Sequence, residues 1–336
     1  MTSTAGPAPT ATTTASAPTW ADIAAAHQRI AGRIHRTPVM TSATLDQLTG
    51  AQLFFKCENL QKTGSFKIRG ATNAIFSLNE QEAARGIVTH SSGNHAAAVS
   101  CAAAWRGVPA WIVMPNNAPK VKSAAVEAYG GKITFCEPTA SARNAAAAKI
   151  QAETGAAMVH PYDDDRIIAG QATAAKELLE DAGPLDAILC PVSGGGLLSG
   201  TCLAAKHLQP EIVIFGCEPQ LADDAYRSLE TGVLQTMESS TTIADGLRAS
   251  LAARTFAILR NHLAGIYLVT EAEIVEAMQL LWQRLKVITE PSSAIALAPL
   301  LRAGGVGRLT RPGSAKSPRV GIILSGGNID LNSLPF

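Results

Sequence analysis

Short apolar runs alternate with alanine-rich stretches along most of this chain, and that alternation constrains the fold more than any other feature. The runs with the length and composition of buried strands are AQLFFKCE, RGIVTHSS, PAWIVMP, GKITFCE, AAMVHPY, LDAILCPV, EIVIFGCEP and RVGIILSGG. The segments between them, such as ASARNAAAAKIQAETG and IAGQATAAKELLEDAG, are rich in residues that favour helices. Because strands that alternate with helices form parallel sheets covered on both faces, the sequence predicts an α/β fold with doubly wound parallel sheets.

The length of the chain sets how many lobes such sheets can form. With 336 residues, 47% of them hydrophobic, the chain can bury more than one core. Before Trp20, the segment TSTAGPAPTATTTASAPT is rich in Thr, Ala and Pro and lacks the apolar core of a signal peptide. We therefore predict a disordered tail over residues 1–19, followed by two lobes.

The charge balance excludes several classes of partner. The chain has 28 Lys and Arg against 27 Asp and Glu, and no basic run is interleaved with aromatic residues. We expect no nucleic-acid partner and, because the apolar stretches are shorter than a membrane span, no membrane partner. The six cysteines are scattered without a C-x-x-C pair, which is typical of buried thiols in a reducing compartment. These features predict a soluble cytoplasmic protein.

Lys67 lies in the segment KTGSFKIRGA, in a Gly/Ser turn that leads into a predicted helix. Most lysines are solvated, but this one follows Phe66, an aromatic residue that could lie against a flat ring. Desolvation in such a turn lowers the pKa of a lysine and frees its amine for covalent chemistry. Lys67 is therefore a candidate Schiff-base lysine.

Two loops follow predicted strands and open helices, where α/β proteins commonly bind anions. The first loop, in the segment Ser91–Ala98, offers hydroxyls and helix N-terminal amides to a carboxylate or a phosphate. Ordinary helix capping by Ser92 or Asn94 explains this loop equally well. The second loop, PVSGGGLLSG, lets the bare amides of glycines 194–196 approach a phosphate. It is neither a dinucleotide fingerprint nor a P-loop.

Two further segments carry polar groups after predicted strands. GCEPQLADDAYRSL contains Glu218, Asp223 and Asp224, and clustered carboxylates suit a hard divalent cation. Acidic residues at a helix start on a solvated face would give the same pattern, so both interpretations stay open. IILSGGNIDL ends a predicted strand at Ser325, just before two glycines.

Together these segments resemble one family. KTGSFKIRGA, SSGNH, the SGGG loop, EPQLADD and the terminal SGGN are similar to motifs of the fold type II pyridoxal-phosphate (PLP) enzymes, in the branch of serine/threonine dehydratases and serine racemase. The resemblance runs from about Trp20 to Leu331. It implies two lobes with the cofactor between them: a large domain of residues 20–85 and 161–336 and a small domain of residues 86–160. It also implies a homodimer.

The resemblance assigns a role to each segment. It implies that Lys67 forms the Schiff base with PLP and that Ser92, on the opposite face, is a second catalytic group. It implies that the cofactor is also held by Phe66, Asn94, Ser193, Gly194, Gly195, Gly196, Leu197 and Ser325. Residues that would hold the substrate carboxylate or lie beside it are Ser91, Ser92, Asn94, His95 and Arg143. Glu218, Asp224 and the carbonyl of Ala222 match a site for Mg²⁺, Mn²⁺ or Ca²⁺.

The expected reaction follows from the implied role of Ser325. A serine hydroxyl does not help to protonate the pyridine nitrogen as a carboxylate would, so the ring is a weaker electron sink and a long-lived carbanion is disfavoured. Elimination of a β-hydroxyl while Lys67 takes the α-proton suits such a cofactor. We therefore predict a dehydratase (ammonia-lyase) that converts L-threonine or L-serine, or the bulkier 3-hydroxyaspartate or phenylserine, to a 2-keto acid and ammonia.

Three positions differ from close relatives. Ala249 and Tyr162 replace Ser and Asn of the animal racemase, which makes the predicted pocket more apolar. We expect threonine or a bulkier substrate to match or exceed serine, with little racemisation. Ala97 replaces a glutamine near a nucleotide-effector site, so we expect no activation by ATP. A racemase of the serine racemase type and a catalytically silent binding protein are the alternatives, and the intact Lys67 argues against the second.

Overall fold

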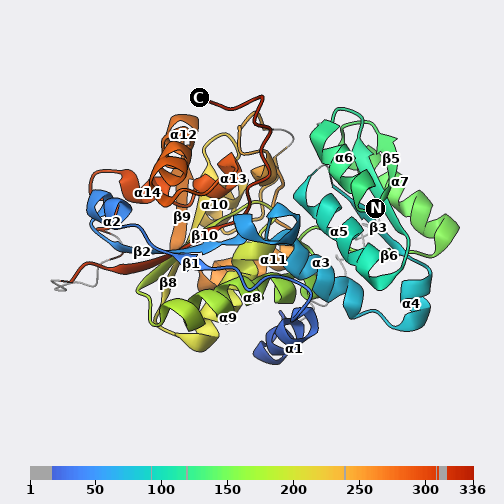
Figure 1. The fold of residues 1–336 in the computed structure, drawn as a ribbon, viewed down its shortest axis with the longest axis horizontal. Coiled ribbons are helices and arrows are strands. Elements are labelled where there is room, and N and C mark those ends of the chain that lie inside the picture. Colours follow the sequence, from blue (N-terminus) through green and yellow to red (C-terminus); the bar gives the residue numbers. More distant parts are fainter. Residues whose placement is uncertain (1–16, 92, 119, 238–239, 308, 310–315) are drawn as a thin grey trace, which may run out of the picture.

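The architecture is described by a computed structural model of the chain, which covers residues 17–336 except 92, 119, 238–239, 308 and 310–315 (Figure 1). It contains two mainly parallel sheets with helices packed against them, which confirms the predicted fold class. Of the predicted tail, residues 1–16 lie outside the described part, and the Thr19 side chain already caps the first helix. In the part of the chain that is described, no helix is both long and apolar enough to cross a membrane.

The larger sheet has six strands in the order β1-β2-β10-β7-β8-β9. Their bounds are β1 Val39–Met40, β2 Gln52–Cys57, β7 Ala187–Pro191, β8 Val213–Pro219, β9 Gly265–Val269 and β10 Arg319–Leu324. β1 runs antiparallel to β2, and the other neighbours are parallel. Because β10 lies between β2 and β7, the SGGN segment that follows β10 comes close to the Lys67 segment that follows β2.

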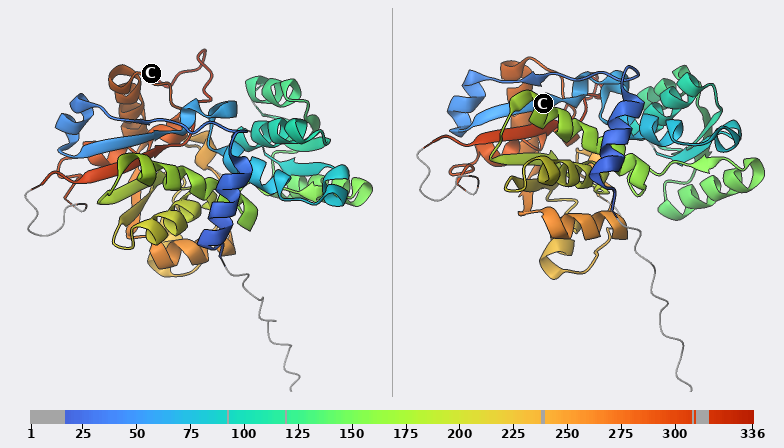
Figure 2. Two further views of the ribbon diagram at one scale, coloured as in Figure 1. Left: turned by 60° about the horizontal axis from the view of Figure 1, so that its bottom comes forward. Right: turned by 90° about the horizontal axis from the view of Figure 1, so that it is seen from below.

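The smaller sheet has four parallel strands in the order β5-β4-β3-β6. Their bounds are β3 Ile87–His90, β4 Ala110–Pro115, β5 Lys132–Cys136 and β6 Ala157–Met158. Figures 1 and 2 show this sheet with its helices beside the larger one, and α3 lies where the two meet. The domain boundaries after residues 85 and 160 stay a prediction.

Helices fill the connections between the strands. Their bounds are α1 Trp20–Ile30, α2 Ala43–Thr49, α3 Lys67–Phe76, α4 Glu80–Ala84, α5 Asn94–Arg106, α6 Lys120–Ala128, α7 Ala140–Thr154, α8 Asp165–Ala182, α9 Gly196–Leu208, α10 Asp224–Thr231, α11 Ala253–His262, α12 Glu271–Leu280, α13 Pro291–Ala294 and α14 Ala298–Leu301. Two short 3-10 turns also matter for the site, η1 Glu58–Leu60 and η3 Asp245–Leu247.

Consecutive residues of the central strands enter different cores. In β10, Ile322 and Leu324 pack in a core shared with α2, α12 and α14, whereas Ile323 packs in a core shared with α1, α8 and α9. In β3, Ile87 and Val88 divide between two cores in the same way. Because both faces are buried, these strands read as continuous apolar runs, and the eight that were predicted are all present. The prediction missed two strands of the described part, β1, which is short, and β9. The β9 segment, AGIYLVT, lies between two helices.

Candidate active site

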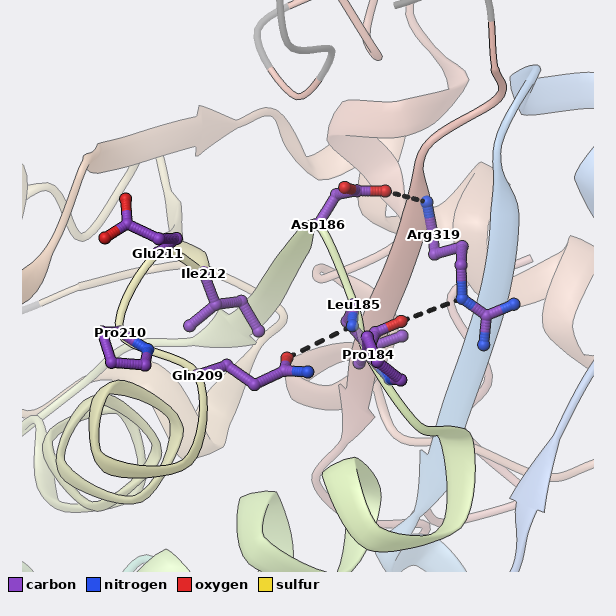
Figure 3. A pocket seen from close by; sticks show the side chains of 8 residues that line it. All are labelled: Pro184, Leu185, Asp186, Gln209, Pro210, Glu211, Ile212 and Arg319. Carbon is purple, nitrogen blue, oxygen red and sulfur yellow. Dashed lines mark hydrogen bonds between the residues drawn. The ribbon is translucent and has the colours of Figure 1, made fainter.

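A surface pocket of about 320 Å³ lies at the amino ends of β7, β8 and β10 (Figure 3). Its polar groups satisfy one another: the backbone N of Arg319 donates to Asp186 Oδ2 at 2.8 Å, and Arg319 Nε donates to the Pro184 carbonyl at 2.9 Å. Ligands of parallel sheets bind at the opposite, carboxyl ends of the strands. The predicted site residues follow those carboxyl ends, so this pocket is not the candidate active site.

Lys67 is the first residue of α3, and its position is fixed by the end of β10. The backbone N of Phe66 donates to the Ser325 carbonyl at 2.9 Å, and Ser65 forms a β-bridge with Gly326. The Nζ of Lys67 donates to the Pro161 carbonyl at 3.0 Å and lies 5.0 Å from the centre of the Phe66 ring. Burial lowers the pKa of Lys67 to about 8, so about a tenth of the amine is unprotonated at neutral pH.

The SGGG loop forms the start of α9, directly after β7. Gly195 has a φ of +87°, and a Cβ on Gly194 would lie 2.3 Å from the Tyr162 ring, so neither position has room for a side chain. Ser193 is tied to Ala249, with its Oγ donating to the Ala249 carbonyl at 3.2 Å and accepting from the Ala249 N at 3.1 Å. No side chain caps α9 within the described residues, so its first amides are available to an anion.

The SSGNH loop opens α5, whose N-terminus also lacks a side-chain cap among the described residues. Ser91 Oγ accepts from the Gly93 N at 3.3 Å. His95 is 2% exposed, and its Nε2 lies 3.1 Å from the Val159 carbonyl. Burial, with the charge of Lys67, holds the pKa of His95 well below its usual range, so the ring is neutral. Ser92, the predicted second catalytic group, lies outside the described residues.

Asn94 connects this loop to a residue that the sequence analysis missed, Glu290. The Nδ2 of Asn94 donates to Glu290 Oε1 at 2.8 Å, and its Oδ1 accepts from Asn328 Nδ2 at 2.9 Å. Glu290 is 3% exposed, and its Oε2 has no partner among the described residues. Burial, reinforced by the charge of Asp245, raises the pKa of Glu290 to about 8. The available signal was a glutamate inside the otherwise apolar segment VITEPSSAIALAPL.

A second feature, of which the sequence analysis named only Tyr162, is an aromatic wall at the ends of β3 and β6. The rings of His90 and His160 lie 5.3 Å apart, and those of His160 and Tyr162 lie 4.7 Å apart, both edge to face. Burial lowers the pKa of His90 to about 4, so this ring is also neutral. Arg143 of α7 acts electrostatically on His90 and Tyr162, and its Nε is buried without a hydrogen-bond partner among the described residues. The wall therefore adjoins an arginine that can still accept an anionic partner.

The predicted metal ligands lie together between β8 and α10. Glu218 and Asp224 are 1% and 2% exposed, and neither forms an ion pair within the described part of the chain. The carboxylate of Glu218 accepts from the backbone N of Ala225 at 2.9 Å and of Tyr226 at 2.8 Å. Burial raises the pKa of Glu218 well above its usual range and that of Asp224 to about 6. The solvated acidic face, the alternative interpretation of this segment, is therefore wrong.

The arrangement suits a phosphorylated aldehyde such as PLP. Glycines 194–196 form an anion cradle that a Cβ would fill, and Lys67 provides a partly buried amine with a lowered pKa. Phe66 and Ser325 are joined by a backbone hydrogen bond directly beside that lysine. Asn94 lies between Glu290 and Asn328. The predicted cofactor residues thus come from the ends of β2, β3, β7 and β10, where ligands of α/β proteins bind.

Comparisons with known proteins agree with this geometry. Residues 30–326 match the family model described as pyridoxal-phosphate dependent enzyme. The beta-hydroxyaspartate dehydratase of Paracoccus denitrificans (strain Pd 1222) is 50% identical over 95% of this chain and 99% of the relative. The crystal structure of serine racemase from Dictyostelium discoideum has a TM-score of 0.88 at 49% identity, covering 94% of this chain and 99% of that one. The structure of maize serine racemase has a TM-score of 0.91 at 45% identity, with coverage of 94% and 95%. The chain therefore belongs to the family of pyridoxal-phosphate-dependent enzymes and shares the fold of its type II members.

Proposed function

We propose that this enzyme is a dehydratase that eliminates the β-hydroxyl of a β-hydroxy-α-amino acid and prefers one with a second carboxylate, 3-hydroxyaspartate. The products are a 2-keto acid and ammonia. The observation that carries the preference is Arg143, whose Nε is buried without a partner among the described residues beside the wall of His90 and Tyr162. The 50% identical relative named beta-hydroxyaspartate dehydratase supports the same choice.

The chain's own groups suit this elimination. When bound, PLP supplies an electron-withdrawing ring that makes the α-proton of the substrate acidic. Lys67 takes that proton, because its pKa of about 8 keeps part of the amine unprotonated at neutral pH. Burial lowers the pKa of His90 and of His95, so both imidazoles are weaker bases than Lys67 and do not compete with its amine for the proton. Lys67 and Ser92 are thus the proposed catalytic pair, Ser92 being needed only if the amino acid is also racemised.

Two carboxylates of the substrate require two anion sites. The amides at the start of α5, which lack a side-chain cap within the described residues, suit the α-carboxylate. Arg143 suits the second carboxylate, since its guanidinium is always charged and its enclosed Nε has no hydrogen-bond partner among the described residues. Serine and threonine would leave Arg143 unpaired. A site built for such a group discriminates against ligands that lack it.

The test compares kcat/KM for L-threo- and L-erythro-3-hydroxyaspartate, L-threonine and L-serine in the wild type and in Arg143→Met. We expect 3-hydroxyaspartate to be preferred, and the substitution to lower its kcat/KM by about 10²-fold while threonine changes less than about threefold. Arg254→Met is the control, because Arg254 already pairs with Asp163 and Asp165. Equal losses for all substrates would show that Arg143 holds the α-carboxylate instead. A wild-type preference for L-serine, with D-serine as the main product, would overturn the proposal in favour of a racemase.

We also propose that Glu218, Asp224 and the Ala222 carbonyl bind Mg²⁺, Mn²⁺ or Ca²⁺. Two buried carboxylates with raised pKa values and no cationic side chain paired to them, among the described residues, support a bound cation. The ion would stabilise the start of α10 rather than take part in chemistry. The homodimer and the cytoplasmic location stay predictions.

A further inference from the structure

Four charged side chains lie in the interior of the larger lobe and contact one another. They are Lys56 of β2, Glu58 of η1, Arg69 of α3 and Glu177 of α8, and each is between 0% and 3% exposed. Arg69 donates to Glu58 through Nε at 2.6 Å and Nη2 at 2.8 Å. It donates to Glu177 through Nη1 at 2.9 Å and Nη2 at 2.8 Å. Lys56 Nζ completes the group with a 2.7 Å contact to Glu177. We refer to these four residues as the buried ion cluster.

The buried ion cluster has two cations and two anions, so it is neutral as a whole. Burial by itself would raise the pKa of Glu177, but the hydrogen bonds and charges of Arg69 and Lys56 lower it to about 2. Buried ion pairs seldom stabilise a fold more than apolar side chains of the same volume would. Their best-attested use is to specify one arrangement of the elements they join.

Arg69 joins α3 to α8, and these helices meet backbone to backbone. A Cβ on Gly170 would lie 2.6 Å from the Gly70 Cα, and the Gly70 N donates to Gln171 Oε1 at 3.1 Å. Lys67 opens α3, and its Nζ donates to the carbonyl of Pro161, four residues before α8 begins. A shift of α3 along α8 would therefore move Lys67 relative to the segment that holds it.

The same helix α8 supports the phosphate loop. A Cβ on Gly200 of α9 would lie 2.6 Å from the Ile168 carbonyl and 2.7 Å from the Ala172 N, so α9 also meets α8 backbone to backbone. α9 begins at Gly196 of the SGGG loop. One helix thus positions both the lysine and the anion cradle (Figures 1 and 2).

We propose that Arg69 is a positioning residue: through the buried ion cluster it locks α3 in one register on α8 and so sets where Lys67 lies relative to the phosphate loop. Two hydrogen bonds near the close contact, from the Gly70 N to Gln171 Oε1 and from Asn73 Nδ2 to the Arg166 carbonyl at 2.6 Å, also join α3 to α8, but each bonds a single acceptor. The planar fork of Arg69 fixes the register, because it bonds two carboxylates from different elements at once.

The test separates cofactor binding from the covalent step. Binding of PLP to the cofactor-free full-length protein is compared with binding of 4-deoxypyridoxine 5′-phosphate, which keeps the phosphate and ring but has a methyl group in place of the aldehyde. Arg69→Lys keeps the charge and removes the fork. We expect its affinity for PLP to fall about tenfold more than its affinity for the analogue, and kcat to fall about 10²-fold with KM nearly unchanged.

Matched variants show whether the selective loss of PLP affinity arises from a displacement of α3. Gly170→Ala pushes α3 off α8 and should weaken PLP selectively, whereas Gly200→Ala pushes α9 off α8 and should weaken both ligands. Arg302→Lys is the control, since Arg302 also makes a two-bond contact with a glutamate, Glu273, but touches neither α3 nor α8. It should change neither affinity.

A milder variant covers the case in which Arg69→Lys does not fold. Thr173→Val removes a 3.1 Å hydrogen bond from Arg69 Nη1 and should give the same selective loss on a smaller scale. The proposal is overturned if the two ligands weaken equally in Arg69→Lys or Thr173→Val. It is also overturned if these variants lose thermal stability while PLP affinity and kcat stay at wild-type values.

Discussion

The buried ion cluster and the active site are both polar and enclosed, but they differ in how completely their groups are paired. In the buried ion cluster, Arg69 bonds both glutamates, and Lys56 bonds Glu177 and the Thr37 carbonyl at 2.6 Å. In the active site, buried atoms lack partners within the described residues: Arg143 Nε, Glu290 Oε2, His95 Nδ1 and the hydroxyls of Thr63 and Ser65.

This difference distinguishes a structural cluster from a site that binds. Leaving a buried polar atom without a partner costs about 1–3 kcal/mol, and a ligand that pairs with such an atom recovers that cost. Unpartnered atoms such as Gln171 Nε2 and Ser199 Oγ also occur away from the active site, so they indicate binding only beside groups such as Lys67 and the anion cradle. The paired cluster needs no ligand to be stable. The active-site atoms gain partners when cofactor and substrate bind, so their positions indicate where the polar groups of these ligands lie.

The largest expected effect comes from the lysine at the centre of the active site. Lys67→Ala should lower kcat by at least about 10³-fold, because the side chain that bonds the cofactor and takes the α-proton is lost. The measurements are 2-keto acid formation and the visible absorbance of the purified protein, which should both disappear. A variant with near-normal turnover would contradict the whole assignment of the site.

Breaking the buried ion cluster should instead lower the stability of the fold. Arg69→Met leaves Glu58 and Glu177 buried without their partner, and we expect the free energy of unfolding to fall by about 3–5 kcal/mol. Chemical denaturation measures this. Arg302→Met, which breaks a partly exposed arginine–glutamate pair, should cost no more than about 1 kcal/mol. Similar losses of unfolding free energy in the two variants would mean that burying an arginine–glutamate pair does not raise the cost of breaking it.

Glu290 predicts how stability depends on pH. Because its folded pKa is about 8, the folded state keeps a proton that the unfolded state has lost between pH 4.5 and 8, and stability falls as pH rises through this window. The slope is at most about 1.4 kcal/mol per pH unit. Lys67, whose folded pKa is lowered to about 8, acts oppositely: stability rises with pH above 8.

The measurement is the denaturation midpoint of the cofactor-free protein at pH 5.5 to 8. Glu290→Gln cannot titrate and should flatten the decline. Glu273→Gln is the control, because hydrogen bonds from Arg302 lower the pKa of Glu273 to about 2 and its titration lies outside the window. An unchanged slope in Glu290→Gln would show that this carboxyl is already ionised in the folded state.

The smallest expected effect concerns the acidic site near α10. If a divalent cation bridges Glu218 and Asp224, EDTA should lower the melting temperature by about 2–4 °C, and added Mg²⁺, Mn²⁺ or Ca²⁺ should restore it. Glu218→Gln should melt at a lower temperature and no longer respond to EDTA. No response in the wild type, with no metal found by elemental analysis, would show that Glu218 and Asp224 bind no cation.

The sequence by itself determined the strands and the loops that end them. Buried parallel strands are continuous apolar runs, and anion-binding loops need glycine and hydroxyl residues within a few positions, so both leave local patterns. The SGGG loop was predicted for this reason, whereas Lys67 was singled out from its turn and the adjacent Phe66, and the role of Ser325 was implied only by the family resemblance. β9 was missed because its run lies between two helical segments and carries no such loop.

Only the tertiary structure decided which buried charges are paired and which are open. Asn94 and Glu290 are 196 positions apart in the chain, and Arg69 and Glu177 are 108 apart, so no local pattern links them. The local sequence does not show whether a glutamate pairs with an arginine or has an unpartnered oxygen. Glu177 pairs with Arg69, whereas Glu290 Oε2 has no partner among the described residues. The protonation of such a glutamate depends on burial and on the charges that the fold brings beside it, and those are properties of the packed chain.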